Sequence, residues 1–144
     1  NNRPFNSTDG PNGEALLNLG PGDYAVTISG SGDVVGGYRF RLLDTAAAVA
    51  LTPGTAVTNT LAPGNETDLY RFTVAAETRV YFNSITSSGL PNLYWRCYGP
   101  SGQGVLANSF SDSGPRALEL GGTYTLLINA KSGPGRFKLQ ITAN

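Results

Sequence analysis

Two carboxylates lie close together in the stretch Asn-Glu-Thr-Asp-Leu-Tyr, at Glu66 and Asp68. Side chains two residues apart on a β-strand point to the same face, so both carboxylates would serve one site. Calcium prefers several carboxylate and carbonyl oxygens, which Asn65, Glu66 and Asp68 could offer, with Asp112 in another turn. The alternative is a polar strand entrance in which Asp68 is hydrogen-bonded to a neighbouring turn. Glu66 and Asp68 are our candidate calcium ligands, and no other cofactor is indicated.

Catalytic chemistry has few residues to use in this chain. The sequence contains no histidine, which excludes nucleophiles activated by histidine and metals bound by histidine. The single cysteine, Cys97, cannot form an internal disulfide and is expected to be a small buried apolar side chain. A glycosidase needs two carboxylates set across a sugar, and a single Glu-x-Asp pair supports that arrangement poorly. We therefore predict a protein that is not an enzyme and has no catalytic residue.

Three tyrosines form the other group with binding chemistry. Tyr81, Tyr94 and Tyr98 fall in the middle of the sequence and alternate with the apolar residues of their segments. If the three rings face solvent together, they could stack on sugars or face a partner. The alternative is packing between neighbouring strands, where an aromatic pair contributes about 0.2–1 kcal/mol. These three tyrosines are the candidate ligand-facing aromatics.

Composition and charge limit the class of protein. The chain has 144 residues, of which 40% are hydrophobic, enough for one domain, or one and a fraction, with a real core. Ten basic and ten acidic residues cancel without any basic run, so nothing indicates binding to nucleic acid or an anionic membrane. No apolar stretch approaches the roughly 18 residues of a membrane span. The first four residues do not have the pattern of a signal peptide.

Apolar residues at every second position are the main structural signal. They occur in short segments rich in aromatic and β-branched residues, and turns rich in glycine and proline separate these segments. Such spacing predicts an all-β protein, a sandwich or a barrel of many short antiparallel strands. The residues expected to face the core of the middle segments are Tyr70, Phe72, Val74, Val80, Phe82, Leu93, Trp95 and Cys97.

The second structural signal is an internal repeat with an offset of about 100 residues. Segment 22–28, Gly-Asp-Tyr-Ala-Val-Thr-Ile, aligns with segment 122–128, Gly-Thr-Tyr-Thr-Leu-Leu-Ile, and segment 37–42 aligns with segment 136–141. Self-similarity at a fixed period is typical of repeat arrays. The inward residues expected in the first copy are Tyr24, Val26, Ile28, Tyr38, Phe40 and Leu42, and their counterparts are Tyr124, Leu126, Ile128, Phe137, Leu139 and Ile141.

The repeat places a seam near residue 44. Residues 1–44 are expected to be the C-terminal half of a preceding repeat, and residues 45–144 to be one complete module. Half a sandwich leaves an apolar face uncovered and strand edges unpaired. Three outcomes stay open: residues 1–44 pack on residues 45–144, another copy or a neighbouring repeat supplies the missing half, or residues 1–44 are partly disordered. Segment 44–51 could form one helical turn, but Pro53 and Gly54 favour a linker.

Three short motifs fall in the second module: a strand opening Glu66-x-Asp68-x-Tyr70-x-Phe72, a hairpin with Tyr98, Pro100 and Gly102, and a closing Gly122-Thr123-Tyr124. Together they resemble the bacterial pre-peptidase C-terminal (PPC) domain, over about residues 50–144 and, as a second copy, residues 15–44. The resemblance implies a jelly-roll-like antiparallel β-sandwich that is extracellular, attached to secreted enzymes or repeated in tandem in surface proteins. It also implies relatives that bind collagen, carbohydrate or calcium.

We therefore expect a non-enzymatic structural module of a repetitive, adhesin-like protein at the cell surface, or a filament subunit. Assembly would proceed by strand complementation, with copies of the chain or neighbouring repeats as partners. The alternative is a carbohydrate- or collagen-binding module that uses Tyr81, Tyr94 and Tyr98. The complementing surface would consist of Tyr24, Val26, Ile28, Tyr38, Phe40 and Leu42.

Overall fold

The computed structural model describes residues 16–30, 32–63, 66–89, 92–130 and 133–144. These residues form one short 3-10 helix and a series of β-strands. The elements are η2 (Thr45–Ala47), β1 (Val49–Ala50), β2 (Ala56–Leu61), β3 (Thr67–Val74), β4 (Thr78–Ser88), β5 (Leu93–Tyr98), β6 (Gly104–Ser109), β7 (Ser113–Leu118), β8 (Gly122–Ala130) and β9 (Gly135–Ala143). No helix in these ranges is long and apolar enough to span a membrane.

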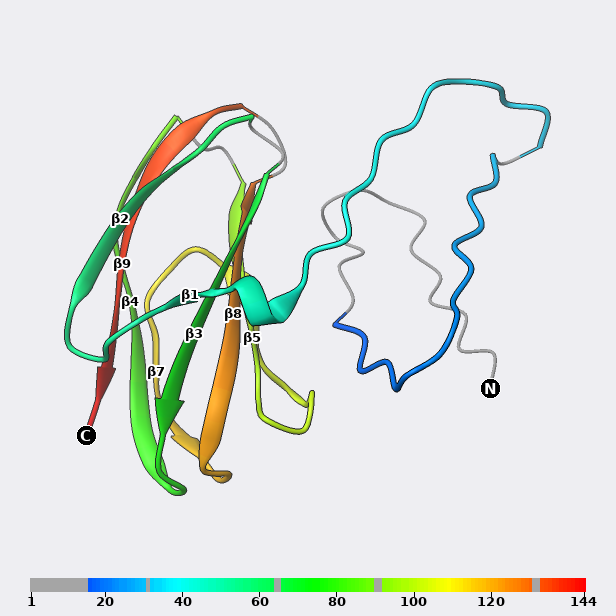
Figure 1. Cartoon of the computed structure of the whole chain (residues 1–144). Helices are drawn as coiled ribbons and strands as arrows, with labels where there is room; N and C mark the ends of the chain where they lie inside the picture. Colours follow the sequence, from blue (N-terminus) through cyan, green and yellow to red (C-terminus); the bar gives the residue numbers. More distant parts are fainter. Residues whose placement is uncertain (1–15, 31, 64–65, 90–91, 131–132) are drawn as a thin grey trace.

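The strands form two sheets that face each other (Figure 1). The five-stranded sheet has the order β1-β3-β8-β5-β6, and the four-stranded sheet has the order β2-β9-β4-β7. The strand pairs are antiparallel except for β1, which pairs in parallel with β3 through Val49 and Tyr70. Most consecutive strands lie in opposite sheets, as in a jelly roll. The predicted antiparallel β-sandwich is therefore confirmed.

Aromatic side chains from both sheets fill the core. Phe72 of β3 stacks on Tyr124 of β8 with ring centroids 5.5 Å apart, and it meets the edge of Phe82 of β4 across the sandwich at 6.3 Å. Phe82 in turn meets Trp95 of β5 at 5.8 Å. The predicted inward residues of β3, β4 and β5 are buried as expected, except that Val74 is only partly buried at the margin of the core.

The closing strands β8 and β9 occupy the interior of the sandwich. Strand β8 lies between β3 and β5, and β9 lies between β2 and β4, so each strand pairs on both of its edges. The pair therefore supplies one interior strand to each sheet. The predicted inward residues of this copy are all buried: Tyr124, Leu126, Ile128, Phe137, Leu139 and Ile141.

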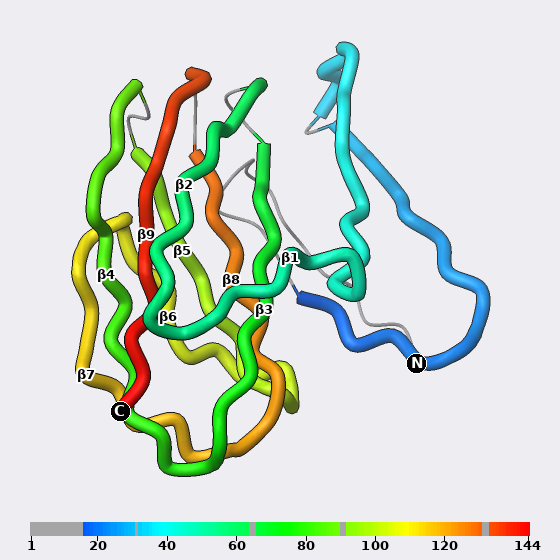
Figure 2. The backbone as a smooth tube through the Cα atoms, turned by 60° about the vertical axis from the view of Figure 1, so that its left-hand side comes forward, coloured from blue at the N-terminus to red at the C-terminus, as the bar shows by residue number. Residues whose placement is uncertain are grey.

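The first copy of the repeat folds differently from its counterpart. Residues 16–30 and 32–43 contain no strand in the described part of the chain, although segments 22–28 and 37–42 were expected to be strands. Figures 1 and 2 show this segment, coloured blue to cyan, running beside the sandwich and not within it. The physical reason is that a strand needs a neighbouring backbone, and within the described ranges no backbone hydrogen bond joins residues 16–43 to the sandwich.

Matched substitutions in the two copies test this difference in packing. Leu139→Ala removes a fully buried side chain and is expected to lower the free energy of unfolding by about 2–5 kcal/mol. Phe40→Ala changes the aligned position, where the side chain is exposed, and is expected to shift this free energy by less than about 0.5 kcal/mol. Urea unfolding followed by the fluorescence of Trp95, the single tryptophan, measures both. A comparable loss in the two variants would contradict the structure.

Candidate assembly surface

The strongest candidate site is the apolar face of residues 16–43. Its six predicted residues have exposed fractions between 44% at Ile28 and 74% at Leu42, whereas none of their six counterparts in β8 and β9 is more than 1% exposed. Covering a large apolar side chain is worth about 1.5–3 kcal/mol. A surface with this many exposed apolar residues on one short segment is typical of an interaction site. We call this segment, residues 16–43, the donor segment.

A tyrosine hydrogen bond shows that the donor segment retains local structure of its repeat. The hydroxyl of Tyr24 donates to the carbonyl oxygen of Gly20 at 2.7 Å, and the hydroxyl of Tyr124 donates to that of Leu120 at 2.6 Å. In both copies a glycine precedes the tyrosine by two residues and has a positive φ, 157° at Gly22 and 139° at Gly122. The same turn therefore forms with and without the surrounding sheets. The sequence alignment paired these residues but did not predict the hydrogen bond.

The second half of the donor segment keeps the side-chain spacing of a strand. The rings of Tyr38 and Phe40 stack with centroids 6.4 Å apart, as residues i and i+2 on one side of an extended chain do. Their counterparts, Phe137 and Leu139, point into the core from β9. The donor segment thus has an apolar face that resembles the inward face of β9, and no sandwich covers it.

The donor segment does not bury this face on its own sandwich. Packing of residues 1–44 on residues 45–144 was one of the three outcomes left open, and it is wrong for the described residues because the six side chains remain exposed. Residues 1–15 belong to the same predicted half-repeat and lie outside the described residues. The donor segment lies close to the sandwich near both ends. The side-chain amide of Asn18 lies next to Gly102, and the Arg41 guanidinium lies 3.2 Å from the Glu66 carboxylate.

The seam between the copies is docked on the sandwich. The Asp44 carboxylate accepts a hydrogen bond of 2.9 Å from the Ala46 amide and so caps η2, a short helical turn within the stretch that was expected to be a linker. Strand β1 follows directly and pairs with the edge of β3. The Leu51 amide then donates to the carbonyl oxygen of Arg71 at 2.7 Å, and the Leu51 side chain is buried. The donor segment is therefore joined to the sandwich by a short, hydrogen-bonded connection.

Glu66 takes part in this seam. One of its carboxylate oxygens lies 3.2 Å from the Arg41 guanidinium of the donor segment, and the other accepts a hydrogen bond of 3.1 Å from the Ala62 amide. The ion pair is partly solvent-exposed, so it contributes about 1 kcal/mol or less. The carboxylate predicted as a calcium ligand thus contacts a cation of the protein itself.

Asp68 is held in a different set of hydrogen bonds. Its carboxylate accepts from the Asn59 amide at 2.9 Å and from the Tyr70 hydroxyl at 3.3 Å. Burial raises the pKa of Asp68 above its ordinary value of 3.8, and the nearby Glu66 carboxylate raises this pKa further. Burial likewise raises the pKa of Tyr70 to about 12, so its hydroxyl remains a donor at neutral pH.

The structure adds no further ligand to the calcium prediction. Asn65 lies outside the described residues, and Asp112 accepts hydrogen bonds from the backbone amide and the hydroxyl of Ser84 at 2.8 and 3.0 Å. Within the described ranges no group of three or more Asp, Glu, His or Cys side chains comes together. Calcium binding by Glu66 and Asp68 stays a prediction.

The raised pKa of Asp68 predicts a pH-dependent stability. The folded protein holds the Asp68 proton more tightly than the unfolded chain does, so the resulting stabilisation is complete at low pH and is lost as pH rises through the folded-state pKa. Asp68→Asn removes this titration and should flatten the fall in unfolding free energy as pH rises above the ordinary Asp pKa of 3.8. Urea unfolding at several pH values measures the difference from the wild type.

Asp33→Asn serves as the control for this experiment, because Asp33 is an exposed carboxylate in the donor segment. It should leave the pH profile of the sandwich as in the wild type. A profile for Asp68→Asn that falls as steeply as the wild-type profile would show that Asp68 is not the group responsible.

The three candidate tyrosines do not form one surface. Tyr81 points outward from β4 of the four-stranded sheet, because its neighbours Val80 and Phe82 point into the core. Tyr94 and Tyr98 point outward from β5 of the five-stranded sheet. The prediction of a shared aromatic face is wrong, since the rings lie on opposite outer faces. Alternation showed correctly that all three point away from the core, but it does not tell which sheet a strand joins.

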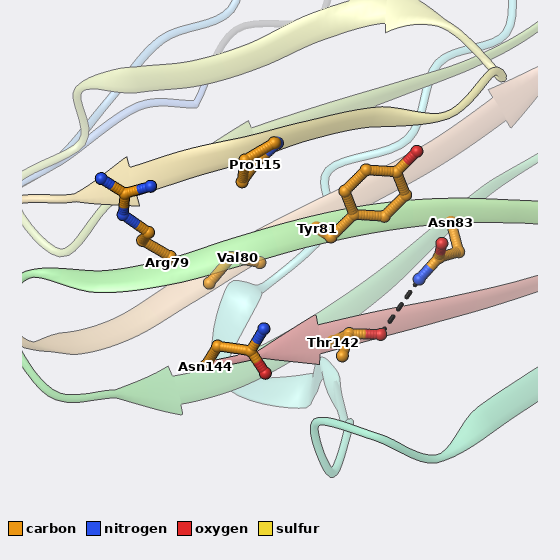
Figure 3. A pocket seen from close by; sticks show the side chains of 7 residues that line it. All are labelled: Arg79, Val80, Tyr81, Asn83, Pro115, Thr142 and Asn144. Carbon is orange, nitrogen blue, oxygen red and sulfur yellow. Dashed lines mark hydrogen bonds between the residues drawn. The ribbon is translucent and has the colours of Figure 1, made fainter.

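Tyr81 lies in a surface hollow of about 470 Å³ on the four-stranded sheet. Figure 3 shows its ring beside Pro115, with Asn83 donating a hydrogen bond of 3.0 Å to the Thr142 hydroxyl. The hollow contains one aromatic ring and a single charged side chain. Its lining residues are Arg79, Val80, Tyr81, Asn83, Pro115, Thr142 and Asn144.

Cys97 is a structural residue, as predicted. It is fully buried in β5, and burial raises the pKa of its thiol to about 12. A nucleophilic thiol would have to be accessible and ionised near neutral pH, and this thiol is neither.

No family model and no curated protein matches the chain. Among solved structures, the chain is similar to the pre-peptidase C-terminal domain of collagenase from Bacillus anthracis, with 19% identity, a TM-score of 0.51, and coverage of 66% of this chain and 94% of that one. It is also similar to PliG, a periplasmic inhibitor of g-type lysozyme. The Salmonella Typhimurium protein has 13% identity, a TM-score of 0.52 and coverage of 67% and 98%.

PliG from Aeromonas hydrophila is similar to the same degree, with 14% identity, a TM-score of 0.50 and coverage of 67% of this chain and 96% of that one. At such low identity the likeness shows the fold alone. The resemblance to the PPC domain is therefore confirmed as a likeness of fold. These solved chains are matched over nearly their whole length, while about a third of this chain has no counterpart in them.

Proposed function

We propose that the chain is a non-enzymatic structural module of a repetitive extracellular protein, joined to a neighbouring module by its donor segment. The observation that carries this proposal is the contrast between the two copies of the repeat. Matching apolar residues are covered in β8 and β9 and exposed in the donor segment, and both copies form the same tyrosine turn. A segment that retains one half of a fold gains most from a partner that supplies the other half.

The proposal that the chain is not an enzyme is supported by the lack of available catalytic side chains. The sequence has no histidine, and the Cys97 thiol is buried and protonated. Glu66 and Asp68 are engaged with Arg41, Ala62, Asn59 and Tyr70. The solved proteins with this fold include a periplasmic inhibitor and a domain of a bacterial collagenase, which is consistent with placement at the cell surface or in a secreted array.

Binding of carbohydrate or collagen has less support from the geometry. Sugar-binding surfaces often use several aromatic rings together, and the three candidate tyrosines are divided between two opposite faces. The hollow around Tyr81 offers one ring. Within the described residues, the exposed apolar area of the donor segment is therefore the better candidate for the functional surface.

An extended chain tests the proposed function. In it, residues 45–119 are placed directly before residues 20–144, so that the first half of a module precedes the donor segment. Trypsin cleaves after Arg39 and Arg41, which lie in an exposed stretch of the donor segment. We expect rapid cleavage there in the 144-residue chain and strong protection in the extended chain.

Phe40→Asp in the extended chain is the control, because a carboxylate at the predicted inward position cannot be buried without a large cost. This variant should again be cleaved rapidly, while the following sandwich stays intact. If the wild-type extended chain is cleaved as fast as the 144-residue chain, the structural role of the donor segment is refuted. A panel of glycans and collagen would then be the next test.

A further inference from the structure

We infer that the partner of the donor segment is a sandwich in which the β8 and β9 positions are both vacant, and that a complete copy of this chain is not a partner. This inference rests on the proposed function and specifies the acceptor. The donor segment would insert one interior strand into each of the two sheets of that acceptor. The topology of the complete sandwich, the alignment of the two copies and the burial of their side chains carry the argument.

The first step is the place that the counterpart strands occupy. In the complete sandwich, β8 pairs with β3 from Thr67 to Val74 on one edge and with β5 from Leu93 to Tyr98 on the other. Strand β9 pairs with β2 and with β4 in the same way. Neither position is at the edge of a sheet. A segment that takes these positions therefore completes the middle of both sheets.

The second step is that a complete copy has no room for the donor segment. Its interior positions are already filled by β8 and β9, and the inward side chains of these strands are at most 1% exposed. Closely packed interiors do not admit an additional strand without loss of the resident one. Insertion into an intact copy would thus break as many strand pairs as it forms.

The third step is that pairing at a single sheet edge is insufficient. The edges of the sandwich are β1 and β6 in one sheet and β2 and β7 in the other. The two apolar stretches of the donor segment, 24–28 and 38–42, correspond to strands of different sheets. Addition of one stretch to one edge would leave the apolar side chains of the other uncovered. An acceptor with both interior positions open covers all six residues in the way that β8 and β9 are covered.

The fourth step is the fit between the two copies. Segments 22–28 and 122–128 have equal length and share the glycine, the tyrosine and the final isoleucine. At the inward positions of segments 38–42 and 137–141, all residues are apolar and only the type of side chain differs. Exchanges of this kind alter side-chain shape but preserve the apolar pattern, and cores tolerate them with some loss of stability. The acceptor is therefore a β2-to-β7 half-module of the same type as residues 45–119.

Strand transplants within the 144-residue chain test this inference. The first variant gives β8 the donor sequence through Thr123→Asp, Thr125→Ala, Leu126→Val and Leu127→Thr. The second gives β9 the donor sequence through Phe137→Tyr, Lys138→Arg, Leu139→Phe, Gln140→Arg and Ile141→Leu. Both variants should keep the circular dichroism spectrum of the wild type and unfold cooperatively, at a lower temperature than the wild type.

A matched control shows whether the β8 position requires the apolar pattern of the donor sequence or accepts any sequence. In the first variant, Leu126→Asp replaces Leu126→Val, which puts a charge at a fully buried position and should abolish the folded state. Loss of cooperative unfolding in both transplants would overturn the inference, because the donor sequence would then not fit the β8 and β9 positions. Folding of either transplant, together with failure of the control, supports it.

Light scattering of the unmodified chain tests the exclusion of complete copies. The chain should have the mass of a monomer over a wide concentration range. Oligomers that disappear in Phe40→Asp would overturn the inference, because the donor segment would then bind an intact copy. If such oligomers form but the extended chain is still protected from trypsin, the inference is wrong and the proposed function stands. Loss of the protection from trypsin refutes the proposed function itself.

Discussion

The structure depends on one constraint: a strand persists only where its backbone has neighbours and its apolar side is covered. The two copies of the repeat show this directly, because their patterns of apolar residues are nearly the same. In β8 and β9 the pattern is placed between neighbouring strands and buried, and in the donor segment it has neither neighbours nor cover. The difference between strand and irregular chain here comes from the neighbouring strands and not from the local sequence.

In the donor segment, which has no neighbouring strand in the described structure, the local part of the fold is still present. The bond from Tyr24 to Gly20 spans four residues and needs no second sheet, and the same is true of the turn capped by Asp44. The connection from the donor segment to β3 through η2 and β1 is also short and hydrogen-bonded. A module that completes its predecessor would thus be linked to it over only a few residues.

The sequence predicted those features that depend on one strand at a time. Alternation placed Phe72, Phe82 and Trp95 in the core, and it placed Tyr81, Tyr94 and Tyr98 away from it. It could not predict the assignment of strands to sheets, because that depends on long-range pairing. The error over a shared tyrosine face has this origin.

The engagement of Glu66 with Arg41 was missed for a similar reason. These residues are 25 positions apart, and only the docking of the seam on β3 brings them to 3.2 Å. The internal repeat, in contrast, was visible in the sequence because both copies keep glycine, tyrosine and apolar residues at fixed offsets. From it the sequence predicted a half-module and left three outcomes open for its cover, and the predicted inward residues of segment 16–43 are exposed in the structure.

Backbone amide hydrogen exchange in the extended chain is the most direct measurement of the central claim, because it reports strand formation residue by residue. The account predicts that segments 22–28 and 37–42 become protected to a similar degree as segments 122–128 and 136–141. Exchange of the donor segment at the same rate as in the 144-residue chain, with the second copy protected, would contradict it. The segment would then not be the missing half of a module.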